Sequence, residues 1–98
     1  MKPDELARRY TVSGRVQGVG FRYFVEDAAE KIGVRGFVRN RRDGSVEVYA
    51  IGTQEQLKKL RQALEKGPMM SRVSGVQEEP EAVDARYAGN FTIELTSD

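Results

Sequence analysis

The chain has 98 residues with 16 Lys or Arg and 15 Asp or Glu, and its formal net charge of +1 gives no electrostatic indication of a polyanionic partner. It contains neither Cys nor His, which excludes disulfides, cysteine nucleophiles, Ser-His-Asp triads and His- or thiolate-ligated metals. We expect one domain over residues 1–98, with residues 1–7 as a flexible tail. Because no segment is typical of a membrane span or a signal peptide, we expect a cytoplasmic protein without a membrane partner.

The first predicted elements are a strand, a glycine-containing loop and a helix. Residues 8–16 alternate with a period of two, which predicts a strand. Gln17-Gly18-Val19-Gly20 interrupts this alternation. Apolar side chains in residues 21–32 then recur along one helical face, and Gly33 is the expected end of that helix.

Two strands and the start of a second helix follow. Residues 34–41 predict a strand, and Arg42-Asp43-Gly44 is typical of a hairpin turn. Residues 46–52 alternate as a third strand. Thr53 followed by Gln56 is a capping box, which predicts a helix start at this point.

The last third of the chain predicts one helix end and two more strands. Gly67-Pro68 ends the second helix, whose leucines form one apolar stripe. Residues 72–79 predict a fourth strand with a bulge near Gly75, because the apolar positions on either side of it differ in parity. We expect residues 80–90 to form a loop and residues 91–95 to form a short last strand.

This order predicts an α+β fold of the ferredoxin-like βαββαβ type, with an antiparallel sheet, two helices on one face and a short extra C-terminal strand. In this topology the first two strands are parallel, with the third between them. Their C-terminal ends therefore lie at one edge of the sheet. The loop after Val16 and residue Asn40 are expected to be two strand spacings apart, roughly 10 Å.

The loop between the first strand and the first helix has the features of an anion site. Exposed amides and the positive end of a helix dipole favour an anion, and Gly18 and Gly20 allow close approach of the backbone. Arg22 in the first helical turn adds a guanidinium with bidentate geometry. Taken separately, the glycines are explained by a tight connection and Arg22 by an exposed side chain. Their combination favours a phosphate-sized site.

Asn40 is a second candidate site residue. The alternation of its predicted strand places it on the same face as the apolar residues Val34 and Val38. It lies at the same sheet edge as the glycine loop. One interpretation is a structural amide that binds the following turn. The other is a catalytic amide, which can orient a water molecule but cannot deprotonate it.

Two segments resemble signatures of a known family. Residues 12–22 have the sequence VSGRVQGVGFR, and residues 36–40 have the sequence GFVRN, followed by Gly44, Val46 and Gly52. Both segments resemble the two signatures of the acylphosphatase family, in the family's order and spacing.

The resemblance implies hydrolysis of a carboxyl–phosphate anhydride to a carboxylate and inorganic phosphate. It assigns phosphate binding to Arg22 and the backbone amides of Gln17, Gly18, Val19, Gly20, Phe21 and Arg22, and it assigns water orientation to Asn40. It implies a small-molecule acyl phosphate as substrate, with phosphate or sulfate as competing anions. It implies no metal and no cofactor. Because the net charge is +1 and no stacking pair of aromatic residues is predicted on the sheet, we expect no nucleic-acid partner, and nothing in the sequence requires more than a monomer.

Two alternatives on the same fold are an RNA-binding module and a non-catalytic anion or small-ligand sensor. Arg35-Gly36-Phe37 resembles the start of an RNA-binding motif, but the later aromatic positions of that motif are occupied by Arg39 and Arg41. The sensor would share the anion site and lack the reaction, so an assay for phosphate release separates it from the enzyme.

Overall fold

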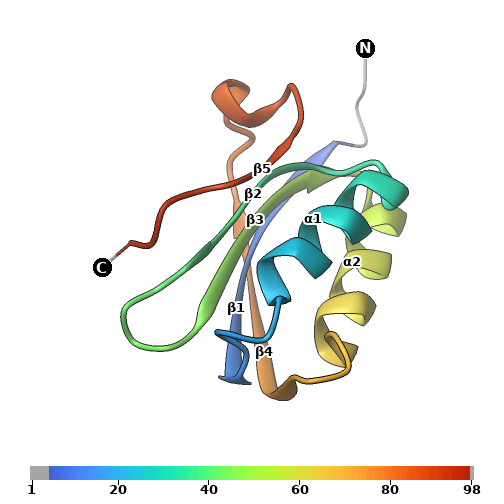
Figure 1. The fold of residues 1–98 in the computed structure, drawn as a ribbon. Helices are drawn as coiled ribbons and strands as arrows, with labels where there is room; N and C mark the ends of the chain where they lie inside the picture. The colour runs from blue at the N-terminus through green and yellow to red at the C-terminus, as the bar shows by residue number, and fades with distance from the viewer. Residues whose placement is uncertain (1–4, 98) are drawn as a thin grey trace.

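In the computed structural model, which describes residues 5–97, one sheet is covered on one face by two helices (Figure 1). The strands are β1 (Leu6–Arg15), β2 (Arg35–Asn40), β3 (Val46–Gly52), β4 (Arg72–Glu81) and β5 (Phe91–Ile93). The helices are α1 (Phe21–Ile32), α2 (Gln54–Lys66) and the short 3-10 helix η1 (Ala85–Tyr87). The predicted ferredoxin-like α+β architecture is confirmed.

The strands follow the order β4-β1-β3-β2-β5. β1 and β2 both pair with β3 in antiparallel fashion, so they are parallel to each other, as predicted. β5 pairs with β2 in parallel, with Gly36 opposite Phe91. The sheet is therefore mixed rather than wholly antiparallel, because the chain crosses the sheet after β4 and enters β5 from the end at which β2 begins (Figure 1).

Both long helices begin and end where the sequence predicts. α1 ends at Gly33, which adopts a left-handed conformation with φ 98° and donates its N–H to the Ala29 carbonyl oxygen. At the start of α2, the Gln56 amide donates to Thr53 Oγ1 over 3.1 Å, and the Thr53 amide donates to Gln56 Oε1 over 2.9 Å. This reciprocal pair satisfies two amides that the helix itself leaves without partners.

Strand β3 is buried on both faces, although its alternation predicts burial on one face only. Val46, Val48 and Ala50 lie in the core beneath the helices. On the other face, Tyr49 packs with Phe37 and Tyr87, and the Tyr49 hydroxyl donates to the Ala82 carbonyl oxygen over 2.6 Å. The segment after β4 thus covers the helix-free face, and the expected plain loop over residues 80–90 contains the end of β4 and η1.

Strand β1 begins two residues earlier than predicted. Leu6 pairs with Gly52, and Ala7 is 1% exposed and pairs with Ile51 and Glu81. Residues 6 and 7 are therefore part of the sheet rather than of the expected flexible tail, because Ala7 belongs to the apolar cluster on the helix-free face. Residues 1–4 of that tail lie outside the described residues.

The register of β1 against β4 changes near the predicted bulge. Ser13 pairs with Gly75, and Gly14 pairs with Val73, so Ser74 is the extra residue on β4. The bulge therefore lies next to Gly75, and it reconciles the two parities of the apolar side chains in this strand.

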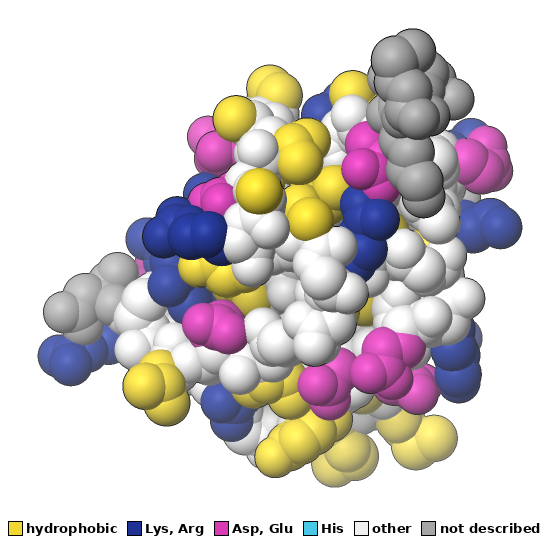
Figure 2. All heavy atoms as spheres, turned by 90° about the horizontal axis from the view of Figure 1, so that it is seen from above, with side chains coloured by type: hydrophobic (Ala, Val, Ile, Leu, Met, Phe, Trp, Pro, Cys, Tyr) yellow, Lys and Arg dark blue, Asp and Glu magenta, His cyan; other side chains and the backbone are white. Residues whose placement is uncertain are grey.

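The surface carries charges of both signs. Figure 2 shows basic and acidic side chains interspersed on the face that it presents, in keeping with the formal net charge of +1. Within residues 5–97, no helix is long and apolar enough to cross a membrane.

Candidate active site

A small pocket of about 80 Å³ lies where the end of β1, the first turn of α1 and the end of β2 meet. It is lined by Val16, Gly18, Gly20, Phe21, Arg22, Tyr23 and Asn40. Five of these are residues that the sequence nominates for phosphate binding or catalysis.

The loop that forms one wall has a backbone conformation that favours glycine. Gly18 has φ 73° and Gly20 has φ 77°, both in the left-handed region. Gly20 is also the N-cap residue of α1, and no side chain donates or accepts a hydrogen bond as a cap there. The first amides of α1 therefore have no acceptor within the helix and remain available to an anion in the pocket.

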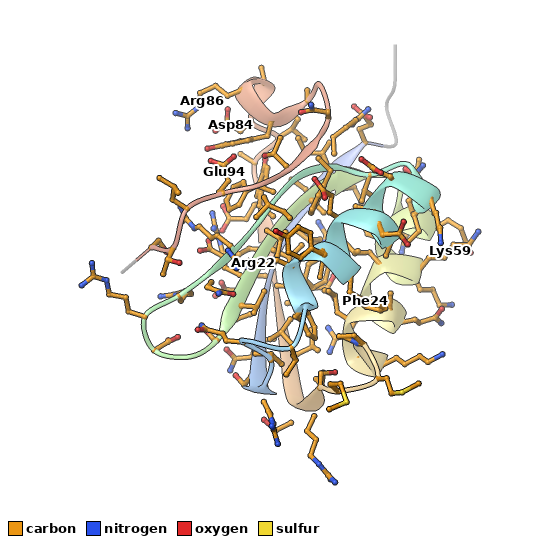
Figure 3. All side chains as sticks on the ribbon, in the orientation of Figure 1. Arg22, Phe24, Lys59, Asp84, Arg86 and Glu94 are labelled. Atoms are coloured by element: carbon orange, nitrogen blue, oxygen red, sulfur yellow. The ribbon has the colours of Figure 1, made fainter. Side chains whose placement is uncertain are left out.

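Arg22 places a cation at the positive end of the α1 dipole. The first turn of α1 carries no acidic residue, and the Arg22 guanidinium forms no hydrogen bond or ion pair with any other of the residues 5–97. A cation in this position is destabilised by about 0.3–1 kcal/mol unless an anion offsets the dipole. Figure 3 shows Arg22 at the beginning of α1, on the side facing away from α2.

Asn40 is the last residue of β2, and its side chain ends in the pocket. Its Oδ1 atom is buried and accepts no hydrogen bond from any described residue. A buried acceptor without a partner costs about 1–3 kcal/mol. The adjoining hairpin does not use this amide, because Asp43 Oδ1 accepts from the Ser45 amide and hydroxyl. Among the described residues, no hydrogen bond joins the Asn40 side chain to this turn, so the structure gives no support to its interpretation as the amide that holds the turn.

Two residues of the predicted phosphate loop do not line the pocket. The Gln17 side chain turns toward the β2–β3 hairpin, where Nε2 donates to the carbonyl oxygens of Arg41 and Ser45. Val19 packs against the core beneath α1. Gln17 and Val19 therefore anchor the loop, whereas Gly18 and Gly20 line the pocket.

Val16 and Tyr23 line the pocket although sequence reasoning did not select them. Val16 is 1% exposed and closes the pocket from the core side, whereas the Tyr23 side chain is 70% exposed. The sequence position of Tyr23 does indicate a place near the pocket, because it follows Arg22 within the first turn of the helix. No comparable signal exists for Val16, whose alternating position indicates only a core residue.

The donors around the pocket favour an anion. Backbone amides and a guanidinium supply donors on one side, and the Asn40 amide supplies an acceptor on the other. Within residues 5–97, no group of three or more His, Cys, Asp or Glu side chains is placed to hold a metal ion.

Comparison with known proteins shows the family to which the chain belongs. The sequence model of the acylphosphatase family matches residues 8–93. The chain is 53% identical over 96 residues to an acylphosphatase of Koribacter versatilis, covering 98% of this chain and 86% of that protein. It superimposes with a TM-score of 0.89 on an acylphosphatase from Coxiella burnetii, at 34% identity, covering 95% of this chain and 96% of the other. The acylphosphatase from Bacillus subtilis gives a TM-score of 0.85 at 38% identity, with 91% and 98% covered. With its sequence and its fold matched over nearly their whole length, this chain belongs to the acylphosphatase family.

Proposed function

We propose that the pocket between α1 and β2 is where this chain hydrolyses acyl phosphates. As a member of the acylphosphatase family, the chain is a hydrolase of carboxyl–phosphate anhydrides. In the proposed site, Arg22 and the amides at the start of α1 hold the phosphate oxygens. Asn40 orients the attacking water from the opposite wall.

The observation that carries this assignment is the Asn40 side chain. Its buried Oδ1 has no protein partner among the described residues, and Asn40 lines the same pocket as Arg22. An amide oxygen in this position can accept an O–H from a water molecule and direct the water oxygen toward phosphorus. Preorganised donors for the phosphate and a fixed water are the two contributions that phosphoryl transfer needs from a protein.

The reaction needs no general acid from the protein. The water oxygen bonds to phosphorus while the bond between phosphorus and the carboxyl oxygen breaks. The leaving group is a carboxylate, which departs without a proton. The proton of the water passes to a phosphoryl oxygen of the substrate, so the products are a carboxylate and inorganic phosphate. This route suits a chain that contains no His.

We do not favour an RNA-binding function for the helix-free face. Phe37 and Tyr49 are 5% and 3% exposed, with Tyr87 packed against both rings. RNA-binding sheets stack bases on exposed aromatic rings, and these two rings are covered.

The test is phosphate release from benzoyl phosphate compared with release from an alkyl phosphate monoester. We expect turnover of the acyl phosphate only, because an alkoxide is a poor leaving group without an acid. Inorganic phosphate and sulfate are expected to inhibit competitively, and activity is expected to persist after exhaustive chelation. Comparable turnover of the monoester would contradict the mechanism, and binding of phosphate without turnover would favour the sensor.

A further inference from the structure

We propose that Gln17 is a positioning residue that fixes the phosphate-binding loop relative to Asn40. This inference rests on the proposed function. Gln17 Nε2 donates to the Arg41 carbonyl oxygen over 2.7 Å and to the Ser45 carbonyl oxygen over 2.8 Å. Both acceptors belong to the hairpin that begins directly after Asn40.

Both carbonyl groups lie where the β2–β3 hairpin closes, and the Arg41 carbonyl oxygen also accepts from the Gly44 amide over 3.1 Å. The Arg41 amide donates to the Ser45 carbonyl oxygen over 2.9 Å, and the preceding pair in the ladder joins Asn40 to Val46. The Ser45 oxygen therefore accepts from Arg41 and from Gln17 together. Gln17 thus binds the hairpin at the residues that adjoin Asn40 on its own strand and on the partner strand.

The loop has few other ties to this region. The ladder between β1 and β3 reaches only to the pair Val12 and Val46, and β1 and β2 are not neighbours in the sheet. Among the described residues, no backbone hydrogen bond joins residues 16–20 to Arg41 or Ser45. Within residues 5–97, the Gln17 side chain therefore links the phosphate-binding loop directly to the hairpin that follows Asn40.

The hydrogen-bond donors of the Gln17 side chain distinguish positioning of the loop from direct binding of phosphate. A glutamine amide nitrogen carries two hydrogens, and both are used by the hairpin carbonyls. Gln17 is also not among the residues that line the pocket. An effect of its side chain on the reaction must therefore pass through the placement of the loop against Asn40. A misplacement of reacting groups by about 1 Å can cost on the order of 10²-fold in rate.

The experiment compares Gln17→Met, which keeps the length of the side chain and removes both donors, with Gln77→Met on the exposed face of β4 as a matched control. We expect Gln17→Met to lower kcat for benzoyl phosphate by about 10-fold, with the inhibition constant of inorganic phosphate within about twofold of the wild type. Gln77→Met should change neither quantity. Rates are measured at a temperature at which circular dichroism shows each variant folded, and Gln17→Asn serves as a second, shorter variant expected to lose rate in the same way.

A double-mutant cycle with Asn40→Ala distinguishes positioning from general support of the fold. If Gln17 acts through Asn40, the Gln17→Met substitution should cost less than about twofold in kcat once Asn40 is replaced. An equal cost in both backgrounds, or equal losses of kcat and phosphate affinity, would overturn the inference. So would a normal kcat in Gln17→Met while Asn40→Ala is inactive, a result that leaves the proposed function intact. A normal kcat in Asn40→Ala would overturn the proposed function and this inference together.

Discussion

The amide nitrogen of Ser97 lies 3.0 Å from the carbonyl oxygen of Asn40 and donates a hydrogen bond to it. The Arg42 amide donates in turn to the Ser97 carbonyl oxygen over 3.0 Å, which continues parallel pairing beyond β5. Asn40 therefore has β3 on one side and the C-terminal segment on the other. The end of the chain, for which the sequence indicates no role, helps to fix the backbone of the proposed water-orienting residue.

Replacing Ser97 tests this relationship. Ser97→Pro removes the donated N–H, and we expect it to lower the free energy of unfolding by about 1 kcal/mol and to reduce kcat. Ser97→Ala keeps the N–H and should behave as the wild type in urea denaturation and in turnover. Equal losses in both variants would show that the hydroxyl, rather than the amide, matters.

Arg22→Lys should be nearly as damaging as Arg22→Ala. The ammonium keeps the charge but lacks the planar fork that binds two phosphate oxygens at once. We expect kcat/KM for benzoyl phosphate to fall by about 10²-fold in both variants, with weaker inhibition by phosphate. Arg72→Lys, at an exposed position of β4, is the matched control. Retention of most activity in Arg22→Lys would mean that Arg22 supplies positive potential alone.

Asn40→Ala should reduce kcat by about 10²-fold while leaving phosphate affinity nearly unchanged. The reason is that the amide acts on the water, and the phosphate is held by the opposite wall. Steady-state kinetics with benzoyl phosphate and phosphate inhibition measure the two quantities. Asn90→Ala, at an exposed position, is the control. A lowered melting temperature with a near-normal kcat would assign Asn40 to structure instead of catalysis.

Gly36→Ala should destabilise the protein strongly. A Cβ atom at Gly36 would lie 1.9 Å from the Tyr49 carbonyl oxygen on β3, and the φ of Gly36 is 141°. Since the neighbour is backbone within the sheet, the clash cannot be relieved by a rotamer change, and we expect a loss of about 3 kcal/mol or more. Gly75→Ala, where a Cβ meets nothing within 4 Å, should stay within about 0.5 kcal/mol of the wild type. Urea denaturation measures the free energy of unfolding of both variants and of the wild type.

Glu47 should make stability depend on acidic pH. Burial, the largest influence, raises its pKa, but the hydrogen bond and charge of Arg39 and the charge of Arg9 together hold the pKa below 4.5. A carboxyl with a lowered pKa stabilises the fold at pH values above its unfolded pKa, and this contribution is lost as the pH falls below it.

Glu47→Gln is therefore expected to be less stable than the wild type by about 1–3 kcal/mol at neutral pH, because it leaves two arginines with a weaker acceptor. The difference should narrow as the pH is lowered below the ordinary pKa of a glutamate, since only the wild type then loses a charge. Urea denaturation at several pH values measures it. A difference that stays constant with pH would show that the charge of Glu47 does not contribute.

The sequence by itself determines the elements whose signals are local. The Thr53–Gln56 capping box, the glycine at the end of α1 and the alternation that puts Asn40 in phase with Val38 each depend on neighbours a few residues apart. Such signals act through backbone preference and nearby hydrogen bonds, which are the same in any tertiary context. Together with the order of the elements, which predicts the topology, they place the loop that contains Arg22 and the strand end at Asn40 at one edge of the sheet.

Only the tertiary structure decided what depends on contacts between distant segments. Tyr87 covers Phe37 and Tyr49, which makes β3 buried on both faces, and Ser97 binds the backbone of Asn40. Gln17 has the local character of a loop residue, and its acceptors lie more than twenty residues further along the chain. Long-range partners are chosen by how the elements pack, because a hydrogen-bonding side chain is satisfied by whichever group the fold brings within reach, and no period or spacing in the sequence records that group.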